Sequence, residues 1–562
     1  MPDRNRQFAS SLAASFADLG VSHVCISPGS RNTPLIAGFA AEGRIKKWTL
    51  LDERSAGFFA IGLARATGLP VALACTSGTA AAEYHPAVIE ASHSEVPLLV
   101  LTADRPEELR NVGAPQTIDQ VGLYGSSVKL FVDAPTPDDA AALSPAELAV
   151  EAWVAATSDT AGPVHLNLPF REPLLDSSPA NPSPSVSEPR LSQSGPVQLG
   201  KIAAQLNGRR GIIVAGRSND REFPRACSEL AAATRWPIFA DPLSGLRHGT
   251  HSLDRVVAFA DPLVAAGTLD RLHPEVILRF GPVPTSKPIW SWMQRHPEID
   301  QILVDPATRD ATNSATITIA VPVTAAAVAL TIAVTEPAPL GWAENWAEFD
   351  ATAEQAVTAT LQTADFPNEP AVARTILTTA ANDACVTIGS SMPIRDIDTF
   401  GGKSRAPLRL MGNRGTNGID GIVSAALGTA ASGAPAVTVL GDVSMFHDIN
   451  SLGTAAQLGL PLTIVVINNN GGGIFHFLLQ HDPDVLEPEV FDRYLATPHG
   501  TDFVAIATAF GIEAHEVTKH SELTRLLSAP ITKPRLIQVR TDREQNAALH
   551  RMVANGVKDA IG

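Results

Sequence analysis

The sequence predicts an α/β fold of three doubly wound domains, each built on a parallel β-sheet. Two observations lead to this prediction. The chain has 562 residues, which at roughly 150 residues per domain makes three or four domains. Short runs of Val, Ile and Leu that end in Gly, Ser, Asp or Asn alternate with Ala-rich helical stretches along the whole chain. Continuous apolar strands between helices are typical of parallel sheets covered on both faces.

A third observation, two changes in composition, divides the chain. The stronger change is the Ser- and Pro-rich segment 176–196, which has no apolar period and is typical of an extended linker. A weaker break follows at residues 335–341. We therefore expect a first domain over residues 1–175, a linker over 176–196, a central domain over 197–335 and a third domain over 336–562.

Composition excludes several classes of protein. The 42 Lys and Arg residues against 58 Asp and Glu give a net charge of −16, which argues against general binding of nucleic acid or anionic membranes. The four cysteines are far apart and form no CxxC pair, which excludes a disulfide scaffold or zinc ribbon and fits a reducing compartment. The N-terminal segment lacks the apolar region of a signal peptide. We expect a cytoplasmic protein that binds small molecules.

Two long stretches carry no charge, residues 316–334 and 421–441. The first contains Pro322 and several Thr residues, and the second is rich in Gly, Ala and Ser. Each fits a buried strand joined to a buried helix better than a membrane span.

The loops that follow the strands are where a ligand site is expected. Right-handed crossovers place these loops at one edge of a parallel sheet, and ligands bind outside that edge. Gly441-Asp442-Val443 ends one apolar run. A segment that should form a helix and a strand then leads to three Asn and three Gly residues, 468–473. A carboxylate and an amide oxygen there suit Mg²⁺, and glycines allow backbone N–H groups to approach a phosphate. A helix cap followed by a turn is the alternative, which the paired spacing disfavours.

An acidic pair, Asp52-Glu53, lies between a short strand and a helix. Two interpretations stay open. The acids can simply stabilise the helix N-terminus through its dipole. Alternatively, a partly buried Glu53 has a raised pKa and exchanges a proton with a heterocycle.

Cations and amides in predicted loops indicate acidic ligands. Turns at residues 27–31 and 76–79 expose N–H groups that suit anions. Arginines bind carboxylates in a bidentate way, and their joint placement after strands favours that role over scattered surface charge. These residues are Arg31, Arg105, Gln116, Lys287, Arg395 and Arg414. Two histidines near the Asp442 and Asn469 loops, His447 and His476, are expected at most to line the site, because no ligand spacing links them.

The pattern GDV–x24–NNNGGG resembles the thiamine-diphosphate enzyme superfamily, in which GD and NN pairs at a similar spacing bind metal and diphosphate. SPGSRNTPL, LLDERSAGFFAIGLA, TSGTA, LTADRPEELR, GAPQTIDQ, GNRGTNGIDG and NNNGGGIF are similar to motifs of the 2-succinyl-5-enolpyruvyl-6-hydroxy-3-cyclohexene-1-carboxylate synthases of menaquinone and phylloquinone synthesis. The resemblance covers the first and third domains densely and the central one thinly, at LRFGPVPTSKPIW. Val443 and His447 depart from the wider superfamily, which often has Gly and an aromatic residue there.

The resemblance implies pyrimidine-binding, central and diphosphate-binding domains in that order. It implies decarboxylation of 2-oxoglutarate on thiamine diphosphate and addition of the resulting carbanion to isochorismate. Glu53 would hydrogen-bond the aminopyrimidine and face the metal loop of a second subunit in a homodimer or homotetramer. Mg²⁺, with Mn²⁺ as an alternative, would be held by Asp442, Asn469 and the Gly471 carbonyl.

The implied site residues form two sets. Cofactor contacts would come from Glu53, Ser77, Gly78, Ile419, Gly441, Asp442, Ser444, Asn469, Gly471, Gly472, Ile474 and Phe475. Substrate contacts would come from Ser30, Arg31, Arg105, Gln116, Lys287, Ser391, Arg395 and Arg414.

Two other functions stay open from the sequence alone. One is a different thiamine-diphosphate lyase, such as an acetolactate synthase or a 2-oxoacid decarboxylase. The other is a nucleotide-binding regulatory or structural protein on the same fold, without catalysis. The central domain is either a vestigial scaffold or holds an effector pocket lined by Arg279 or Arg309.

Overall fold

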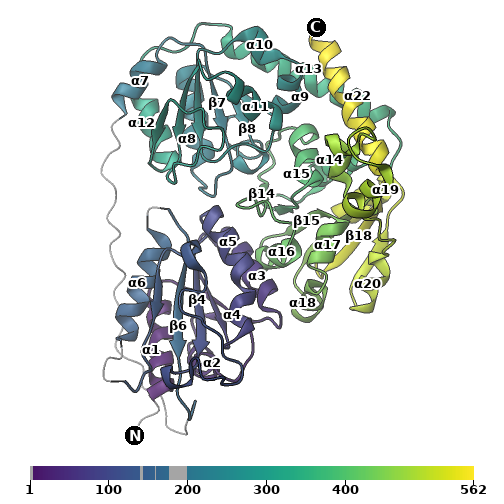
Figure 1. Ribbon diagram of the computed structural model, residues 1–562. Helices are drawn as coiled ribbons and strands as arrows, with labels where there is room; N and C mark the ends of the chain where they lie inside the picture. The colour runs from purple at the N-terminus through teal and green to yellow at the C-terminus, as the bar shows by residue number, and fades with distance from the viewer. Residues whose placement is uncertain (1–3, 140–142, 159, 176–198) are drawn as a thin grey trace. The chain divides into compact units, whose positions relative to one another are not determined.

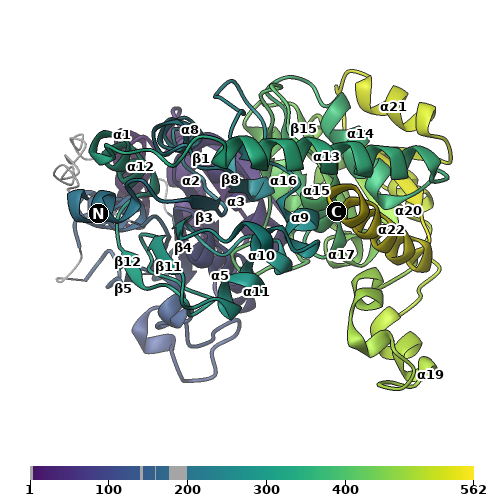
Figure 2. The same ribbon diagram turned by 90° about the horizontal axis from the view of Figure 1, so that it is seen from above.

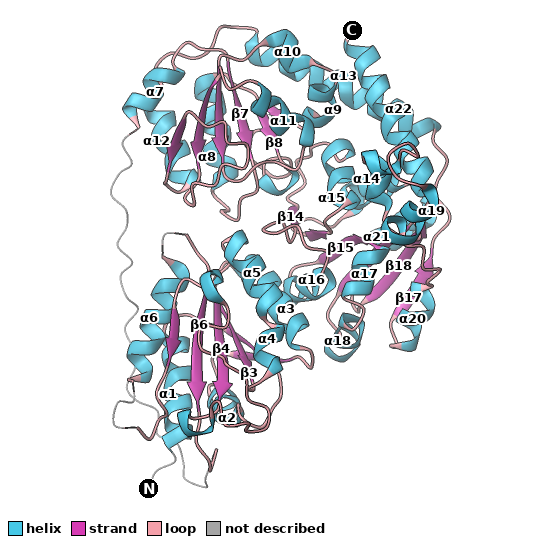
Figure 3. Ribbon diagram, viewed as in Figure 1, coloured by secondary structure: helices cyan, strands magenta, loops and turns pink. Residues whose placement is uncertain are grey.

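The computed structural model describes residues 4–139, 143–158, 160–175 and 199–562. This part of the chain contains three six-stranded parallel sheets with helices on both sides, which confirms the predicted fold class (Figures 1 and 3). The predicted linker, 176–196, lies outside the described residues. By its contacts the chain forms two compact units. The first comprises the described residues of 1–193, 413–436 and 446–462, and the second those of 194–412, 437–445 and 463–562.

The first sheet has the strand order β2-β1-β3-β4-β6-β5. Helices α1, α2 and α6 pack on one face around Phe16 and Phe39, and α3 and α5 cover the other face (Figure 1). The strands are β1 (His23–Ile26), β2 (Lys46–Thr49), β3 (Val71–Cys75), β4 (Leu98–Asp104), β5 (Phe131–Asp133) and β6 (Pro163–Pro169). The helices are α1 (Arg4–Asp18), α2 (Thr33–Ala41), α3 (Glu53–Thr67), α4 (Thr79–Glu83), α5 (His85–Ser94), η1 (Glu107–Leu109), η2 (Gly125–Ser127) and α6 (Pro145–Thr157).

The second sheet has the order β12-β11-β10-β7-β8-β9 and a core that includes four buried tryptophans, Trp236, Trp292, Trp342 and Trp346. Its strands are β7 (Gly211–Ala215), β8 (Ile238–Ala240), β9 (Val256–Val257), β10 (Val276–Phe280), β11 (Asp300–Val304) and β12 (Ile317–Ile319). Its helices are α7 (Gly200–Leu206), α8 (Phe223–Thr234), η3 (Pro242–Ser244), α9 (Ala260–Ala265), α10 (Thr268–Leu272), α11 (Lys287–Arg295), α12 (Val323–Ala333) and α13 (Trp342–Thr363).

The uncharged stretch 316–334 forms a strand and a helix, as predicted, but neither is fully buried. β12 is an edge strand with no buried residue, and α12 buries only one face, leaving Ile332 80% exposed. The expectation of full burial was wrong because an edge strand and its covering helix each keep one side toward solvent.

The third sheet has the order β14-β13-β15-β16-β18-β17, and α13 runs beside α22 (Figure 2). The strands are β13 (Cys385–Ile388), β14 (Arg409–Met411), β15 (Ala436–Gly441), β16 (Leu462–Asn468), β17 (Glu513–Glu516) and β18 (Arg535–Arg540). The helices are α14 (Glu369–Thr379), α15 (Met392–Phe400), α16 (Ile422–Ala431), α17 (Asp442–His447), α18 (Ser451–Leu458), η4 (Gly473–Phe477), η5 (Leu479–His481), α19 (Pro488–Phe491), η6 (Asp492–Ala496), α20 (Phe503–Ala509), α21 (His520–Ser528) and α22 (Arg543–Ile561). The uncharged stretch 421–441 forms α16 and β15.

Two glycines allow α3 and α16 to meet backbone to backbone inside the first unit. A Cβ on Gly62 would lie 1.8 Å from the carbonyl oxygen of Ala425, and one on Gly428 would lie 1.9 Å from that of Phe59. Any larger residue at either position would force the helices apart. This packing places the loop before α16, which carries two predicted site residues, against the first sheet's helices.

Among the described residues, no helix is both long and apolar enough to cross a membrane. All four cysteines are buried and unpaired.

Candidate active site

The predicted site residues are divided between the two units, and each half is described by itself. The second unit contains the predicted metal ligands, and the first contains Glu53 and most of the predicted substrate contacts.

The Asp442 and Gly471 loops meet, as their spacing predicts. β15 and β16 are neighbours in the third sheet, and Asp442 directly follows β15. The backbone N–H of Gly471 donates to Oδ2 of Asp442 at 2.9 Å, and Nε2 of His499 lies 3.1 Å from the same oxygen. Burial raises the pKa of Asp442, so its ionised form would be stabilised by a cation placed beside it.

The side-chain nitrogen of Asn469 forms a hydrogen bond, whereas its side-chain oxygen has no partner among the described residues. Its Nδ2 donates to Oε1 of Glu369 at 2.9 Å, which fixes the orientation of the amide. Its Oδ1 is buried and has no hydrogen-bond partner among the described residues. An unpaired buried acceptor is costly, and an amide oxygen is a good ligand for a hard cation. Burial also raises the pKa of Glu369, whose role the sequence did not reveal.

Gly471 must be glycine, but the loop uses its N–H groups internally. Gly471 has φ +138°, and a Cβ there would lie 1.8 Å from the carbonyl oxygen of Ala496. Gly472 N–H donates to that same oxygen at 2.8 Å, and Gly473 N–H to Gly471 O at 2.9 Å. The glycines therefore close the loop against Ala496 rather than present the free N–H groups expected from the sequence. The Gly471 carbonyl keeps a second lone pair for a cation.

The remaining cofactor positions of the second unit lie on the same elements. Gly441 ends β15, and Ser444 is buried in α17. Ile474 and Phe475 are half-buried on η4, directly after the glycine loop.

Glu53 begins α3, and its neighbour Asp52 caps that helix. The Asp52 carboxylate accepts from Ser55 N–H at 2.8 Å and from Nδ2 of Asn450 at 2.7 Å. The helix-capping interpretation therefore holds for Asp52. Glu53 is half-buried, and burial, with smaller effects from Asp52 and Glu83, raises its pKa. Such a carboxyl is better suited to hold and exchange a proton than an exposed one.

Four predicted contacts come together in the first unit. Nη1 of Arg105 donates to Oγ of Ser77 at 2.9 Å, and Nε2 of Gln116 donates to the Ser77 carbonyl at 3.1 Å. The backbone N–H of Arg31 donates to Oγ1 of Thr76, the residue before Ser77, at 3.2 Å. Burial, followed by repulsion from Arg105, lowers the pKa of Arg31. The Arg31 guanidinium itself donates to the Phe170 carbonyl at 2.8 Å and to the Glu172 carboxylate at 3.0 Å, so a substrate carboxylate would compete with Glu172 for it.

Two further predicted contacts of the first unit, Gly78 and Ser30, are sequence neighbours of Ser77 and Arg31. Gly78 N–H donates to Oε1 of Gln120 at 2.9 Å, and Gly78 has φ +90° at the start of α4. Ser30 is exposed in the turn before α2.

Three predicted substrate contacts lie in the second unit. Lys287 is exposed at the start of α11, Ser391 precedes α15 with φ +73°, and Arg395 donates to the Ser391 carbonyl. Asp261, which the sequence did not single out, connects the start of α11 with α15. It accepts from Oγ of Ser286, beside Lys287, at 2.7 Å and from Oγ1 of Thr399 on α15 at 3.0 Å.

Glu90 anchors the loop that carries Arg414 and Ile419. Its carboxylate accepts from Gly415 N–H at 3.0 Å, from Thr416 N–H at 2.9 Å and from Nη2 of Arg65 at 2.8 Å. Glu90 is 1% exposed. Arg414 and Ile419 are half-buried, and a cavity of about 150 Å³ lies beside the loop, lined by Phe58, Pro86, Ile89, Glu90, Asn413, Thr416, Gly418 and Asp420.

The two predicted lining histidines differ. His447 is exposed at the end of α17. His476 is buried beside His481 and Glu544. Glu544 comes from a helix far along the chain, which spacing cannot reveal. Burial lowers the pKa of His476.

In the central region, both arginines named for an effector pocket are near acids. Nη2 of Arg279 lies 2.7 Å from Oδ1 of Asp310 in a largely buried ion pair. Nε of Arg309 lies 3.5 Å from Oδ2 of Asp305. The effector pocket stays a prediction.

Three family descriptions match the chain: the thiamine pyrophosphate enzyme N-terminal TPP binding domain over residues 6–123, the middle domain of thiamine pyrophosphate enzymes over 190–386 and the C-terminal TPP binding domain over 401–539.

Curated relatives match over nearly their whole length. The chain is 41% identical to 2-succinyl-5-enolpyruvyl-6-hydroxy-3-cyclohexene-1-carboxylate synthase of Chloroflexus aurantiacus, covering 99% of this chain and 96% of the relative. It is 41% identical to the synthase of that name from Geobacillus kaustophilus, covering 100% and 99%, and 37% identical to that of Listeria monocytogenes, covering 98% and 97%. The chain is thus a thiamine-diphosphate-dependent, C–C bond-forming enzyme, and it belongs to the 2-succinyl-5-enolpyruvyl-6-hydroxy-3-cyclohexene-1-carboxylate synthase family.

Proposed function

We propose that this enzyme decarboxylates 2-oxoglutarate and adds the resulting succinyl-semialdehyde carbanion to isochorismate. The products are 2-succinyl-5-enolpyruvyl-6-hydroxy-3-cyclohexene-1-carboxylate and CO₂, within menaquinone biosynthesis in the cytoplasm. The observation that carries the proposal is the first-unit cluster of Arg31, Ser77, Arg105 and Gln116. In a protein of net charge −16, it offers adjacent cations and amides to carboxylates, which both substrates carry.

The second unit would hold the metal and the diphosphate. Asp442, Asn469 and the Gly471 carbonyl would bind Mg²⁺ or Mn²⁺, and the unsatisfied Oδ1 of Asn469 and the buried Asp442 carboxylate support this assignment. Gly441, Ser444, Gly472, Ile474 and Phe475 would complete the pocket. Bound thiamine diphosphate supplies an electron sink for the carbanion.

Glu53 would hold a proton at the aminopyrimidine, which its half-buried position and raised pKa support. By the family resemblance, the site would be made by two chains of a homodimer or homotetramer. Ser77, Gly78 and Ile419 would contact the cofactor from that side.

The substrate carboxylates would be bound by the eight predicted substrate contacts. Ser30, Arg31, Arg105, Gln116 and Arg414 belong to the first unit, and Lys287, Ser391 and Arg395 to the second.

Another thiamine-diphosphate 2-oxoacid lyase, such as acetolactate synthase, is the alternative. The domain limits 1–175, 197–335 and 336–562 are part of the proposal.

The deciding experiment is CO₂ release by the purified protein with thiamine diphosphate and Mg²⁺, with and without isochorismate. We expect release from 2-oxoglutarate that isochorismate stimulates, together with a new adduct in the mass spectrum. Release from pyruvate but not from 2-oxoglutarate would instead support the alternative lyase. Omitting Mg²⁺ and restoring activity with Mn²⁺ tests the metal assignment separately.

A further inference from the structure

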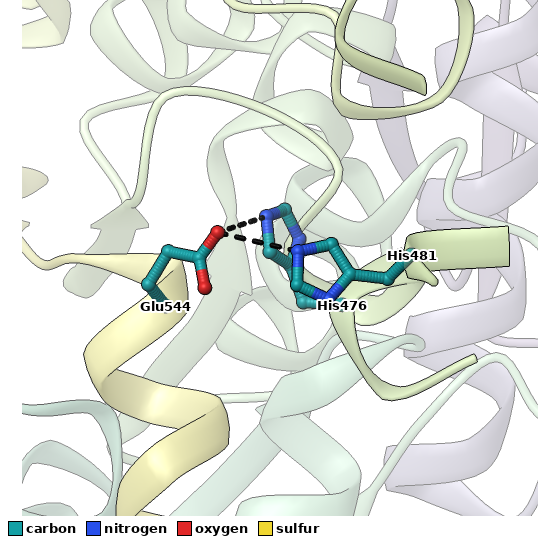
Figure 4. A group of neighbouring side chains, drawn as sticks. All are labelled: His476, His481 and Glu544. Carbon is teal, nitrogen blue, oxygen red and sulfur yellow. Dashed lines mark hydrogen bonds and ion pairs between the residues drawn. The ribbon is translucent and has the colours of Figure 1, made fainter. Parts of the chain in front are cut away.

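Two histidines and a glutamate of the second unit form a cluster outside the proposed active site. His476 lies on η4, His481 ends η5, and Glu544 lies in the first turn of α22. Figure 4 shows a ring nitrogen of each histidine directed at one carboxylate oxygen of Glu544. Nε2 of His481 lies 3.2 Å and Nε2 of His476 3.7 Å from that oxygen, Oε1.

These distances fit a shared cation better than two hydrogen bonds. An N–H···O bond spans about 2.7–3.2 Å, so one contact is at the limit and the other is outside it. Ligands on one tetrahedral ion, with bonds of about 2.0–2.1 Å, lie about 3.3–3.4 Å apart. The three ligand atoms, all within 4.8 Å of one another, need only a small adjustment to reach that geometry.

Packing holds the two imidazoles in place before any ion binds. Their ring centroids are 4.6 Å apart, and the ring of Phe491 packs 5.1 Å from each. His476 is buried, whereas the side chain of Glu544 is 62% exposed. An ion can therefore enter from solvent and keep a water molecule as its fourth ligand.

The local charges are compatible with a cation. Asp492 adds a negative charge near His476, and Arg543 adds a positive one. The guanidinium of Arg543 is held by other groups, because its Nη1 donates to the carbonyl of Asn470 at 2.8 Å and to that of Ala496 at 3.4 Å.

We propose that His476, His481 and Glu544 form a binding site for a divalent transition-metal ion of the Zn²⁺ type. Two imidazoles and one carboxylate favour such an ion over Mg²⁺, which prefers oxygen ligands. The ion would connect η4 and η5 to the start of α22. Since η4 also carries Ile474 and Phe475, binding would stiffen the segment that directly follows the glycine loop. None of these ligands is shared with Asp442 or Asn469.

The test is titration of the full-length protein with Co²⁺, with Mg²⁺ and thiamine diphosphate in excess. We expect one equivalent of Co²⁺ with the strong visible absorption of a four-coordinate, nitrogen-ligated ion, which Zn²⁺ then displaces. His481→Ala and Glu544→Gln should each weaken binding by more than the ten- to hundredfold that loss of an outer partner costs. Both side chains are at least partly exposed, so these variants should fold, which circular dichroism checks.

His515→Ala is the matched control. Nε2 of His515 lies 2.7 Å from Oε1 of Glu513, a histidine–glutamate pair without a second histidine, and its loss should leave Co²⁺ binding unchanged. Hydrogen exchange of the peptide 473–481 should slow with Zn²⁺ in the wild type but not in Glu544→Gln. Three results would each overturn the proposal: absence of the absorption band, binding of Co²⁺ by the two ligand variants as tight as by the wild type, or a loss of binding in the His515→Ala control as large as in those variants. None of these readouts depends on the proposed reaction.

Discussion

The first and third sheets have the same strand order, and their chemistry differs. The order β2-β1-β3-β4-β6-β5 of the first sheet becomes that of the third when twelve is added to each number, giving β14-β13-β15-β16-β18-β17. The second sheet has another order, β12-β11-β10-β7-β8-β9, the doubly wound arrangement common in dinucleotide-binding domains. The chain thus repeats one scaffold at its two ends around a different centre.

Corresponding strand ends of the two like sheets carry different side chains. Arg105 follows β4, whereas Asn469 follows β16, the corresponding strand. After β3 comes Ser77, and after β15 comes Asp442. The first scaffold therefore presents cations and hydroxyls, and the third presents hard oxygen ligands. The strand order positions a site, and the loop residues decide its chemistry.

The largest expected effect tests, at Glu53, whether the first and third scaffolds contribute different chemistry. Glu53→Gln should lower turnover about 10³-fold, since general acid–base catalysis contributes about 10²–10⁴. Folding and cofactor binding should persist, because Asp52, not Glu53, caps α3. Turnover is followed by product formation, and thiamine diphosphate binding by calorimetry. Asp52→Asn is the control, because Asn caps a helix about as well as Asp. Full turnover in Glu53→Gln would contradict a role of the first scaffold in the chemistry.

The next effect concerns stability in the first unit. Glu90→Gln leaves Arg65 buried without its partner charge, which should cost about 3 kcal/mol of unfolding free energy. The amide would also place a donor against the Gly415 and Thr416 N–H groups. Urea unfolding measures the loss, and hydrogen exchange of residues 413–418 locates it. Glu222→Gln, in an exposed pair with Arg225, should leave stability nearly unchanged, because solvent screens such a pair. Equal effects in both variants would contradict the anchoring role of Glu90.

A smaller effect tests the third scaffold. Asp442→Asn keeps an acceptor for Gly471 but removes the charge, so Mg²⁺-dependent binding of thiamine diphosphate should weaken about thirtyfold, or about 2 kcal/mol. The unliganded protein should keep its stability, because burial already disfavours the ionised carboxylate. Calorimetry at several Mg²⁺ concentrations measures the change. Asp542→Asn, at the start of α22, removes a charge from an exposed cap of the same unit and should leave affinity unchanged.

The fold class, and the strand ends that carry the predicted site residues, could be predicted from the sequence. Apolar runs identified the strands, and the spacing between Asp442 and Asn469 correctly placed both at one sheet edge. Their contact then followed from parallel topology. The repeated strand order was out of reach, because the order depends on which strands pair across the sheet and not on their succession.

The partners that hold the site residues were also out of reach. Glu369 orients Asn469 from 100 positions away, and Glu90 holds Gly415 from 325 positions away. Each is a single carboxylate with no motif, and only tertiary packing brings it to its partner. The glycine loop was misjudged in a related way. Its composition predicted free N–H groups, but Ala496, at the end of η6, accepts one of them.

The smallest effect uses pH to separate the two like scaffolds. In the first sheet, His165 of β6 is fully buried, and Oγ1 of Thr102 on β4 lies 2.7 Å from its Nε2. In the third sheet, the corresponding strand, β18, contains no histidine, and its buried residues include Leu536 and Ile537. Burial lowers the pKa of His165 from 6.5 to about 3. Below pH 6.5 the His165 side chain therefore binds a proton in the unfolded chain but stays neutral in the folded protein. The stability of the first unit should then fall by about 1.4 kcal/mol per pH unit until the pH nears 3.

His165→Gln, which can still hydrogen-bond Thr102, should flatten this fall. The measurement is hydrogen exchange of peptides from β4 and β6, with wild type and variant compared at the same pH so that intrinsic exchange rates cancel. Peptides from β16 and β18 are the internal control, since this substitution should leave their pH dependence unchanged. If the first-sheet peptides keep the wild-type pH dependence in the variant, the acid sensitivity comes from groups other than His165. If the third-sheet peptides change by the same amount, the two scaffolds unfold together, and the polar interior of the first does not set its acid limit.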